Sequence, residues 1–426
     1  SQVGGTADIG RRFGDSNQFG VRFNAVNREG GTEVDGEKKR TTAASLGLDY
    51  RGDRLRTSLD MGYQKKTFHH ARNGINISGI DFIPDVPKNS SNYSQKWIFS
   101  DIESEFGLAK AEYDLTDQWT AYAALGAKHT HEVGNYGTPK VLNSEGDATI
   151  GRFQTNRVQD NMSGMVGLRG DFATGPVTHK VNIGYSAMTA NAKNTYRMSY
   201  GNDADTNIYD THDVAQPDTV YSGGTKFGDP LTTYRSRSQG YLLSDTLGFF
   251  DDTLLATLGA RHQKVVVRNY GYDGAEDPTT RYSRSHWLPA YGLLYKATDS
   301  VSLYANHTES LTPGTAAPFG TDNYGSVTGI IHAKQNEVGV KADFGRVGGS
   351  LALFEIKQPV GIKNNNVYTL NGEQRNRGVE LNVFGEPVLG LRLNGSTTWI
   401  DPDMTKTGDS NEDGKTAIGV PRFTAA

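Results

Sequence analysis

The chain contains no cysteine among its 426 residues. Without thiols it forms no disulfide and offers no thiolate as a nucleophile or a metal ligand. The small disulfide-stapled folds of secreted proteins are therefore excluded, and so are thiol enzymes and zinc sites built on cysteine.

Long runs of apolar residues are also missing, and the mean hydropathy is -0.57. No stretch approaches the roughly 20 apolar residues that a membrane-spanning helix needs. A transmembrane β-barrel escapes this test, because only alternate residues of its strands face lipid. Low hydropathy therefore leaves open both a soluble protein and a barrel.

Neither strong charge nor a catalytic motif is present. The formal net charge of -4 is small for this length, so nothing indicates nucleic acid as a partner. The chain has no Gly-x-Ser-x-Gly, no His-Glu-x-x-His and no phosphate-binding loop. We therefore expect no enzymatic activity, no catalytic residues and no metal site.

What the chain does have is an alternation of apolar and polar residues in segments of strand length. In residues 45–50, Leu46, Leu48 and Tyr50 alternate with the polar or small residues at 45, 47 and 49. The same pattern recurs from one end of the chain to the other. Successive side chains of a strand point to opposite faces, so each segment has one apolar and one polar face.

The connections between these segments fall into two classes that follow one another in turn. Short clusters of Asp, Gly, Asn, Ser or Pro predict tight hairpin turns. They lie at 15–18, 52–53, 116–117, 173–176, 251–252, 298–300, 345–346 and 386–387. Long connections are predicted at 29–40, 68–95, 130–150, 194–234, 269–284, 311–334, 360–374 and 401–419.

This alternation of turn and loop is typical of a membrane barrel, which has tight turns at one rim and long loops at the other. It predicts an all-β, antiparallel transmembrane barrel of roughly sixteen strands, with the apolar face toward lipid. Charged residues in mid-strand are then expected on the inner, polar face, where they are solvated or paired. They are Arg22, Glu103, Glu112, Arg169, Glu337, Lys341 and Arg392.

Several phrases of the sequence resemble the barrel of TonB-dependent siderophore receptors of Gram-negative outer membranes. The phrases keep the order they have in that family and together cover most of the chain. They are Gly10–Gly14 with Phe19–Ala25, Leu288–Lys296 with Ser302–Gly314, Asn336–Lys341 with Leu351–Ile356, and Asn376–Leu381.

The resemblance implies a barrel of 22 strands closed by an N-terminal plug. We therefore expect residues 1–426 to form a single domain, a partial barrel that lacks the plug and about the last six strands. The polar start at 1–5 and the strand-like end at 421–426 agree with that expectation.

The resemblance also implies a function: active uptake of a ferric siderophore across the Gram-negative outer membrane. The implied partners are the siderophore, the TonB complex acting through the missing N-terminal region, and outer-membrane lipid and lipopolysaccharide. The receptor is expected to be a monomer without a cofactor, with iron carried only inside its ligand.

Aromatic residues near the long loops are the natural ligand-binding candidates, because rigid rings give contact area at low entropic cost. Two arginines beside the longest loop could meet an anionic ligand. The candidates are Tyr93, Trp97, Tyr136, Tyr221, Arg235, Arg237, Trp287 and Tyr324. Since the loops carry more Tyr and Trp than Lys and Arg, a hydroxamate siderophore is slightly favoured.

Other interpretations stay open at this point. A passive porin would have no plug, and an outer-membrane barrel enzyme such as a protease or phospholipase would need a catalytic constellation at its rim. A secreted β-repeat adhesin would need a fixed repeat period, which these variable loop lengths do not supply.

Overall fold

The computed structural model describes residues 1–224 and 226–426. Its wall consists of sixteen long strands. They are β1 (Gln2–Phe13), β2 (Phe19–Gly31), β3 (Lys38–Arg51), β4 (Leu55–His69), β5 (Phe99–Asp114), β6 (Trp119–Tyr136), β9 (Phe153–Thr174), β10 (Val177–Met198), β13 (Thr232–Phe249), β14 (Leu254–Asn269), β15 (Tyr282–Lys296), β16 (Val301–Pro313), β17 (Ile330–Asp343), β18 (Val347–Asn364), β19 (Val367–Val388) and β20 (Leu391–Thr405).

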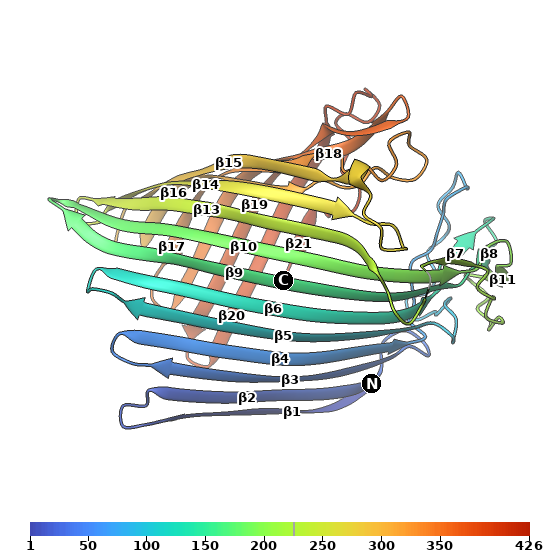
Figure 1. The fold of residues 1–426 in the computed structure, drawn as a ribbon, viewed down its shortest axis with the longest axis horizontal. Helices are drawn as coiled ribbons and strands as arrows, with labels where there is room; N and C mark the ends of the chain where they lie inside the picture. Colours follow the sequence, from blue (N-terminus) through green and yellow to red (C-terminus); the bar gives the residue numbers. More distant parts are fainter. Residues whose placement is uncertain (225) are drawn as a thin grey trace.

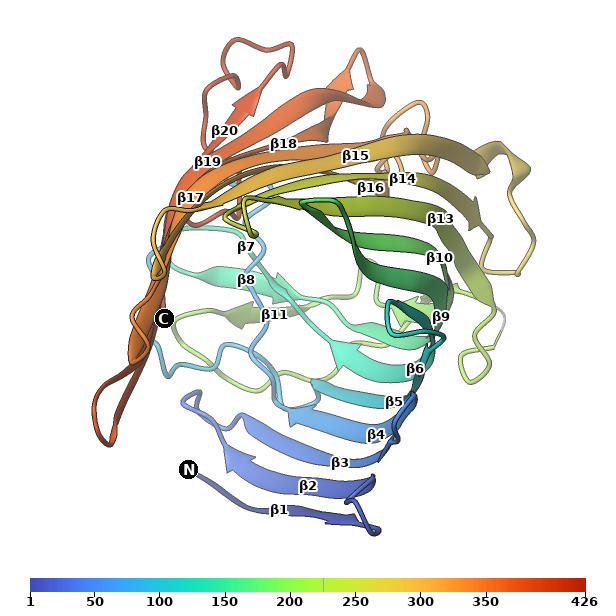
Figure 2. The same ribbon diagram turned by 90° about the vertical axis from the view of Figure 1, so that its left-hand side faces the viewer.

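Each long strand pairs antiparallel with the next long strand along the chain. The resulting sheet curves round into a barrel wall, with tight turns at one end and long connections at the other (Figures 1 and 2). The prediction of an all-β antiparallel barrel with about sixteen strands is confirmed. In the described part of the chain, no helix is long and apolar enough to cross a membrane.

Two predicted connections were wrong, and a third, 29–40, is shorter than predicted because β2 and β3 pair as far as Gly31 and Lys38. The last tight turn lies at Leu389–Gly390, because β19 continues past Pro387 to Val388. The predicted long loop at 360–374 is instead a hairpin in which β18 and β19 pair almost to their tips. Asn365 and Asn366 form its turn with φ values of 46° and 63°, a conformation that asparagine tolerates well.

The loop end contains secondary structure that the alternation pattern did not predict. Strands β7 (Pro139–Val141), β8 (Asp147–Ile150) and β11 (Ala204–Asn207) form a separate three-stranded sheet. A further short strand, β12 (Tyr221–Gly223), pairs with β10. At the end of the chain, β21 (Phe423–Ala425) pairs with the middle of β20, which agrees with the strand-like pattern predicted at 421–426. A 3-10 turn, η1 (Pro278–Thr280), lies in the connection from β14 to β15.

The small sheet gathers three long connections into one unit, which we call the loop-end module: residues 70–98, 137–152 and 199–220. Val141, Ala148 and Ile208 are buried at its centre, with Ile75 and Tyr93 packed against them. In Figure 1 the module lies beyond the loop ends of β5, β6 and β9. A hydrophobic core is therefore present outside the wall, among the loops.

The middle of the wall presents one apolar face. Direct partners in a sheet point to the same side, so one row runs across five neighbouring strands. It consists of Ala305, Val338, Leu353, Val379 and Trp399. Its larger members are exposed, Val338 by 50% and Trp399 by 63%. Exposed apolar side chains in continuous rows are the lipid-facing surface of a barrel, so we call this side outward.

Aromatic rings mark the turn-end limit of the outward face. Phe13, Phe19 and Tyr50 follow one another with ring centroids 5.5 and 5.0 Å apart, and Trp119 lies 5.8 Å from Phe172. These rows have the position of the aromatic belt that such barrels place at the membrane interface.

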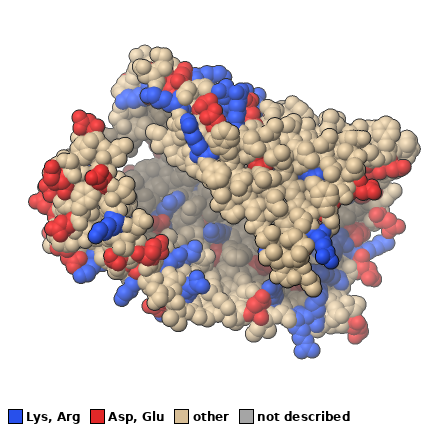
Figure 3. All heavy atoms as spheres, turned by 180° about the vertical axis from the view of Figure 1, so that it is seen from behind, with Lys and Arg blue, Asp and Glu red and all other residues tan. Residues whose placement is uncertain are grey.

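The loop-end limit of the apolar band is equally sharp. One row further along the strands, the outward residues are His307, Asn336, Glu355, Arg377 and Asp401. Figure 3 shows a broad area of the wall without charged side chains and clusters of both signs beyond it. Lipid contact therefore ends near this change of composition.

Most of the predicted inner charges do face inward, but Glu103 does not. It shares the outward face with Tyr63 and pairs with Lys65, whose Nζ lies 3.5 Å from its carboxylate. Glu103 lies beyond the apolar band, where the outward face is wet, so its charge needs no inner lumen to be solvated. Side chains of this strand do alternate between the two faces, but the charge of Glu103 was not sufficient to assign it to the inner face.

Candidate functional site

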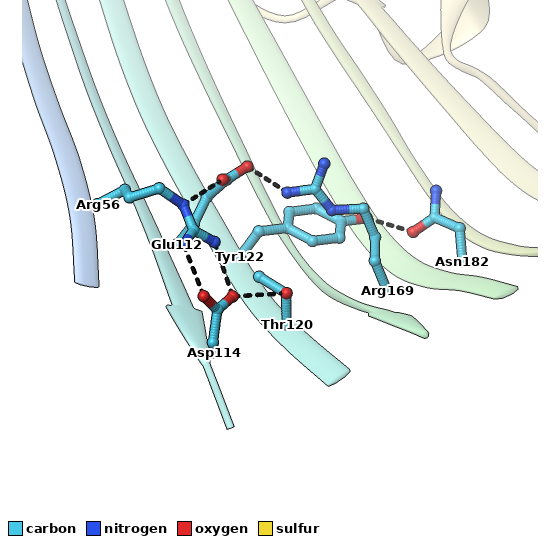
Figure 4. A network of polar contacts seen from close by, with 7 residues as sticks. All are labelled: Arg56, Glu112, Asp114, Thr120, Tyr122, Arg169 and Asn182. Atoms are coloured by element: carbon cyan, nitrogen blue, oxygen red, sulfur yellow. Dashed lines mark hydrogen bonds and ion pairs between the residues drawn. The ribbon is translucent and has the colours of Figure 1, made fainter. Parts of the chain in front are cut away.

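Inward polar side chains at the turn end form one connected network (Figure 4). Arg56 donates from Nη1 and Nη2 to the two carboxylate oxygens of Asp114, at 2.6 and 2.7 Å. Its Nε donates to Glu112 at 3.3 Å, and the second oxygen of Glu112 accepts from Arg169. One carboxylate thus joins two arginines that come from strands β4 and β9.

The same network continues across β6 to β10. The guanidinium of Arg169 lies 5.2 Å from the ring centre of Tyr122, and the Tyr122 hydroxyl donates to Asn182 at 2.9 Å. A recess of about 780 Å³ lies beside these groups and is also lined by Ser186 and Arg261. This inner wall is polar, mostly paired and half-exposed, so it suits contact with a polar surface or with water.

The loop end of the lumen differs in kind, because it holds an arc of aromatic rings. Tyr196 of β10 lies at its centre, with ring centroids 5.6 Å from Phe153, 6.1 Å from Tyr221 and 5.1 Å from Tyr272. Tyr324 lies within electrostatic range of Tyr196 and Tyr272. We call these five residues the mouth arc.

The mouth arc faces inward and is open to solvent. Tyr196 and Tyr221 share the face of Thr155 and Met198, opposite to the outward residues of β9 and β10. Tyr221 is 55% exposed and Tyr324 is 64% exposed. Exposed rings grouped in a concave place supply contact area for a ligand together with phenolic donors.

A partly buried cation, Arg152, lies between the loop end of β6 and the connection after β10. Arg152 donates from Nε to Asn135 at 2.9 Å, and its backbone amide donates to Ser199 Oγ at 2.9 Å. Arg152 belongs to the loop after β8, and burial lowers the pKa of its guanidinium without removing the charge.

Three of the sequence candidates lie in or beside the loop-end module rather than in the arc. Tyr93 donates from its hydroxyl to the carbonyl of Asn73 at 2.9 Å and packs on the core of the module. Trp97 is half-buried, and its Nε1 has no hydrogen-bond partner among the described residues. Tyr136 faces inward and donates to Glu132 at 2.7 Å.

Three other candidates lie on the outward face. Arg235 shares a row with Asp160 and Asn191, and Arg237 lies two residues further along the same strand. Trp287 is 63% exposed on the outward side of β15, with its ring 5.0 Å from that of His262. Of the sequence candidates, Tyr221 lies beside Tyr196 in the arc. Tyr324 lies on the connection between β16 and β17, where its ring meets that of Phe319 at 5.6 Å. The three candidates on the outward face lie outside the lumen.

Sequence reasoning missed Phe153, Tyr196 and Tyr272. The sequence could have identified Phe153 and Tyr196, because both lie near the loop ends of long strands and alternate with outward residues, which places them on the inner face. Tyr272 gave no local signal, because its position depends on how the connection after β14 folds back. In the described residues, no group of three or more His, Asp or Glu side chains is placed to hold a metal ion.

A comparison with protein families shows which family the chain resembles. The family described as TonB dependent receptor-like, beta-barrel, matches residues 34–426.

Among curated proteins, the chain is 48% identical to the ferrichrome receptor FcuA of Yersinia enterocolitica over 99% of its own length and 56% of that receptor. It is 24% identical to the metal-pseudopaline receptor CntO of Pseudomonas aeruginosa over 76% of its length and 46% of that receptor. The chain thus spans about half the length of these relatives.

Solved structures agree on the fold. The ferric preacinetobactin receptor BauA of Acinetobacter baumannii matches with a TM-score of 0.86 and 33% identity, over 99% of this chain and 63% of that one. The siderophore receptor PiuA of the same species matches with a TM-score of 0.82 and 17% identity, over 100% of this chain and 68% of that one.

Proposed function

Because the chain belongs to the family of TonB-dependent receptor-like β-barrels, we propose that it forms the barrel of a receptor for active uptake of a ferric siderophore. The family comprises outer-membrane transport receptors of Gram-negative bacteria and not enzymes. The observation that carries the proposal is the mouth arc, an open group of aromatic rings at the loop end of the lumen.

A hydroxamate siderophore fits this mouth best. The relative FcuA is a ferrichrome receptor, and ferrichrome is a hydroxamate siderophore. Tyrosine rings offer apolar contact and neutral donors, which suit a ligand of low charge better than a cluster of cations would. Tyr221 and Tyr324, two of the residues proposed from the sequence, are the ligand contacts we favour, together with Tyr196.

The remaining partners follow from the two ends of the barrel. We propose that residues 1–426 form one domain, and that the polar inner wall around Glu112 faces a plug supplied by the rest of the receptor. The plug in turn contacts the TonB complex. We also propose a monomer, with the outward charges beyond the apolar band facing lipopolysaccharide head groups.

The binding test uses the full-length receptor and ferric ferrichrome. Tyr196→Ala removes the ring that joins three others, so we expect affinity to fall by about tenfold. The matched control is Tyr241→Ala, an outward tyrosine of β13 that is 65% exposed. Equal effects of the two substitutions, or no binding by the unmodified receptor, would overturn the assignment.

Energy dependence separates active uptake from passive diffusion. Uptake of ferric ferrichrome by cells carrying the receptor is expected to stop when the proton-motive force is collapsed. Uptake that continued unchanged would indicate diffusion through an open pore.

A further inference from the structure

One sector of the outward face carries cations just beyond the loop-end limit of the apolar band. Arg235 and Arg237 lie outward on β13, and Lys264 lies outward on β14 as the direct partner of Gln239. Tyr241, the next outward residue of β13 toward the turn end, is 65% exposed and belongs to the apolar band. Among the described residues, none of the three cations forms an ion pair with a carboxylate. We call these three residues the outer cation group.

Cations elsewhere in the same polar band of the outward face are paired. Arg40 Nη2 lies 3.1 Å from Glu29, and Lys65 Nζ lies 3.5 Å from Glu103. Outward neighbours on one strand are about 7 Å apart and adjacent strands about 4.8 Å apart, so the long side chains of the outer cation group can reach one common anion. Like charges held this close without a counter-ion repel one another, which indicates that an anion from outside the chain completes the group.

The outward face is hollowed beside this group by a recess of about 790 Å³. One row of direct partners crosses the recess, with Gly107 and Ala127 as the floor between Met61 and Met162. The two methionines are 40% and 53% exposed, and a methyl group added to Gly107 would meet no atom beyond its chain neighbours within 4 Å. The recess is therefore open and mostly apolar, and it is large enough for a hydrocarbon chain.

The recess and the outer cation group are continuous. The row of Met162 continues to Thr189 of β10 and from there to Arg237 of β13. At the next outward position of β10 toward the loop end, Asn191 lines the recess, and its Oδ1 accepts from Arg235 Nε at 3.1 Å. A molecule with a hydrocarbon chain in the recess can therefore place its head group beside the two arginines.

Two carboxylates on the rim of the recess lie farther from the cations. Glu105 belongs to β5, which is four strands away from β13 in the sheet. Asp160 belongs to β9, two strands from β13, and its Oδ1 is 2.7 Å from His129 Nδ1. The rim is thus positive at β13 and β14 and acidic toward β5, so it orients a bound anionic group toward β13.

We propose that this place binds lipopolysaccharide of the outer leaflet, with one acyl chain in the recess and a phosphate group held by Arg235, Arg237 and Lys264. The inference rests on the outer-membrane receptor proposed above, whose long loops face the lipopolysaccharide leaflet. Lipid A carries two phosphates beside its acyl chains, which matches three cations better than the single phosphate of a glycerophospholipid does. Because acyl chains in a membrane are already out of water, the recess contributes packing and position, and the cations contribute most of the affinity.

Native mass spectrometry of the full-length receptor in detergent, titrated with diphosphoryl lipid A, tests the cations. The double variant Arg237→Gln with Lys264→Gln removes two charges and keeps side chains of useful length, so we expect affinity to fall by about thirtyfold. The matched control is Arg40→Gln with Lys65→Gln, which removes two paired cations of the same band and is expected to change affinity by less than about threefold. Equal losses in the two double variants would overturn the site.

A second pair of variants tests the recess. Ala127→Leu fills the floor, so the acyl chain loses its packing contacts there and we expect affinity for lipid A to fall by about threefold. Ala121→Leu adds the same side chain to the outward face of the same strand, nearer the turn end and outside the recess. It is expected to leave the affinity unchanged, and an equal effect of the two substitutions would show that no acyl chain occupies the recess.

Two further titrations of the same preparations identify the lipid and separate this site from the proposed function. Phosphatidylglycerol is expected to bind about tenfold more weakly than diphosphoryl lipid A, and equal binding would overturn the assignment to lipopolysaccharide. Affinity for ferric ferrichrome is expected to stay unchanged in all four variants, and a loss that parallels the loss of lipid A would overturn the site as a separate one. A receptor that bound lipid A but not ferric ferrichrome would keep the lipid site and overturn only the proposed function.

Discussion

The turn end and the loop end of the same strands are stabilised in different ways. At the turn end, Arg56, Glu112 and Arg169 are paired on the inner wall but remain 38–50% exposed. At the loop end, Ile98, Ile150 and Ile208 are fully buried. The wall thus needs little protein core of its own, because lipid covers its apolar face, whereas loops in water must bury apolar side chains against one another.

The comparison also separates two kinds of surface offered to the lumen. The turn end offers paired charges over a broad area, and the loop end offers exposed aromatic rings around Tyr196. Partly exposed, paired charges can orient a polar partner but contribute little binding energy. Exposed rings contribute apolar contact area to a ligand. The loop end is therefore suited to binding a ligand, and the turn end is suited to contact with a polar protein surface.

The largest expected effect concerns the core of the loop-end module. Ile208→Ala leaves a cavity in a fully buried site, so we expect the local free energy of opening to fall by about 2–4 kcal/mol. Hydrogen exchange of β8 and β11 measures it. The control is Ile183→Ala, an outward residue that is 45% exposed, which is expected to change opening by less than about 1 kcal/mol. Equal losses would remove the distinction between the two ends.

A smaller effect is expected at the turn end. Glu112→Gln removes the charge that Arg56 and Arg169 share, and because all three are partly exposed the loss is expected to be about 1 kcal/mol, seen as a lower Tm. Glu103→Gln breaks a single outward pair of similar exposure and is expected to lower Tm less. If Glu103→Gln had the larger effect, the inner network would add nothing beyond separate pairs.

The smallest effect is a pH dependence confined to the loop-end module. The amides of Asn143 and Asn207 donate to Asp147 and hold the pKa of its carboxyl below the usual range. A lowered pKa contributes stability above the unfolded-state value, and this contribution is lost as pH falls through the lowered one. Protection of β8 is therefore expected to fall on acidification below about pH 4, and an Asp147→Asn variant should lack this acid step.

Much of the fold was accessible from the sequence, and the site only in part. Residues an even number apart on a strand share a face. Trp287 therefore lies on the lipid side with Leu293, and Arg237 lies there with Leu243. Both were wrongly assigned to the ligand site because the alternation was not counted along these strands. His286 and His332, whose rings lie 4.6 Å apart, gave no comparable signal. They lie on different strands, and they meet only because β15 and β16 separate.

The sequence by itself determined the strands, the tight turns, the antiparallel order and the family. All of these depend on a period of two and on turn chemistry, which are local properties of the chain. Only the tertiary structure decided that residues 139–150 and 204–207 share a sheet, that the ring of Tyr196 meets three others, and that the end of the β16–β17 hairpin leaves the ladders with β15 and β18. Those features depend on contacts between segments that are distant in the sequence. Local sequence patterns do not show which of the possible long-range contacts form.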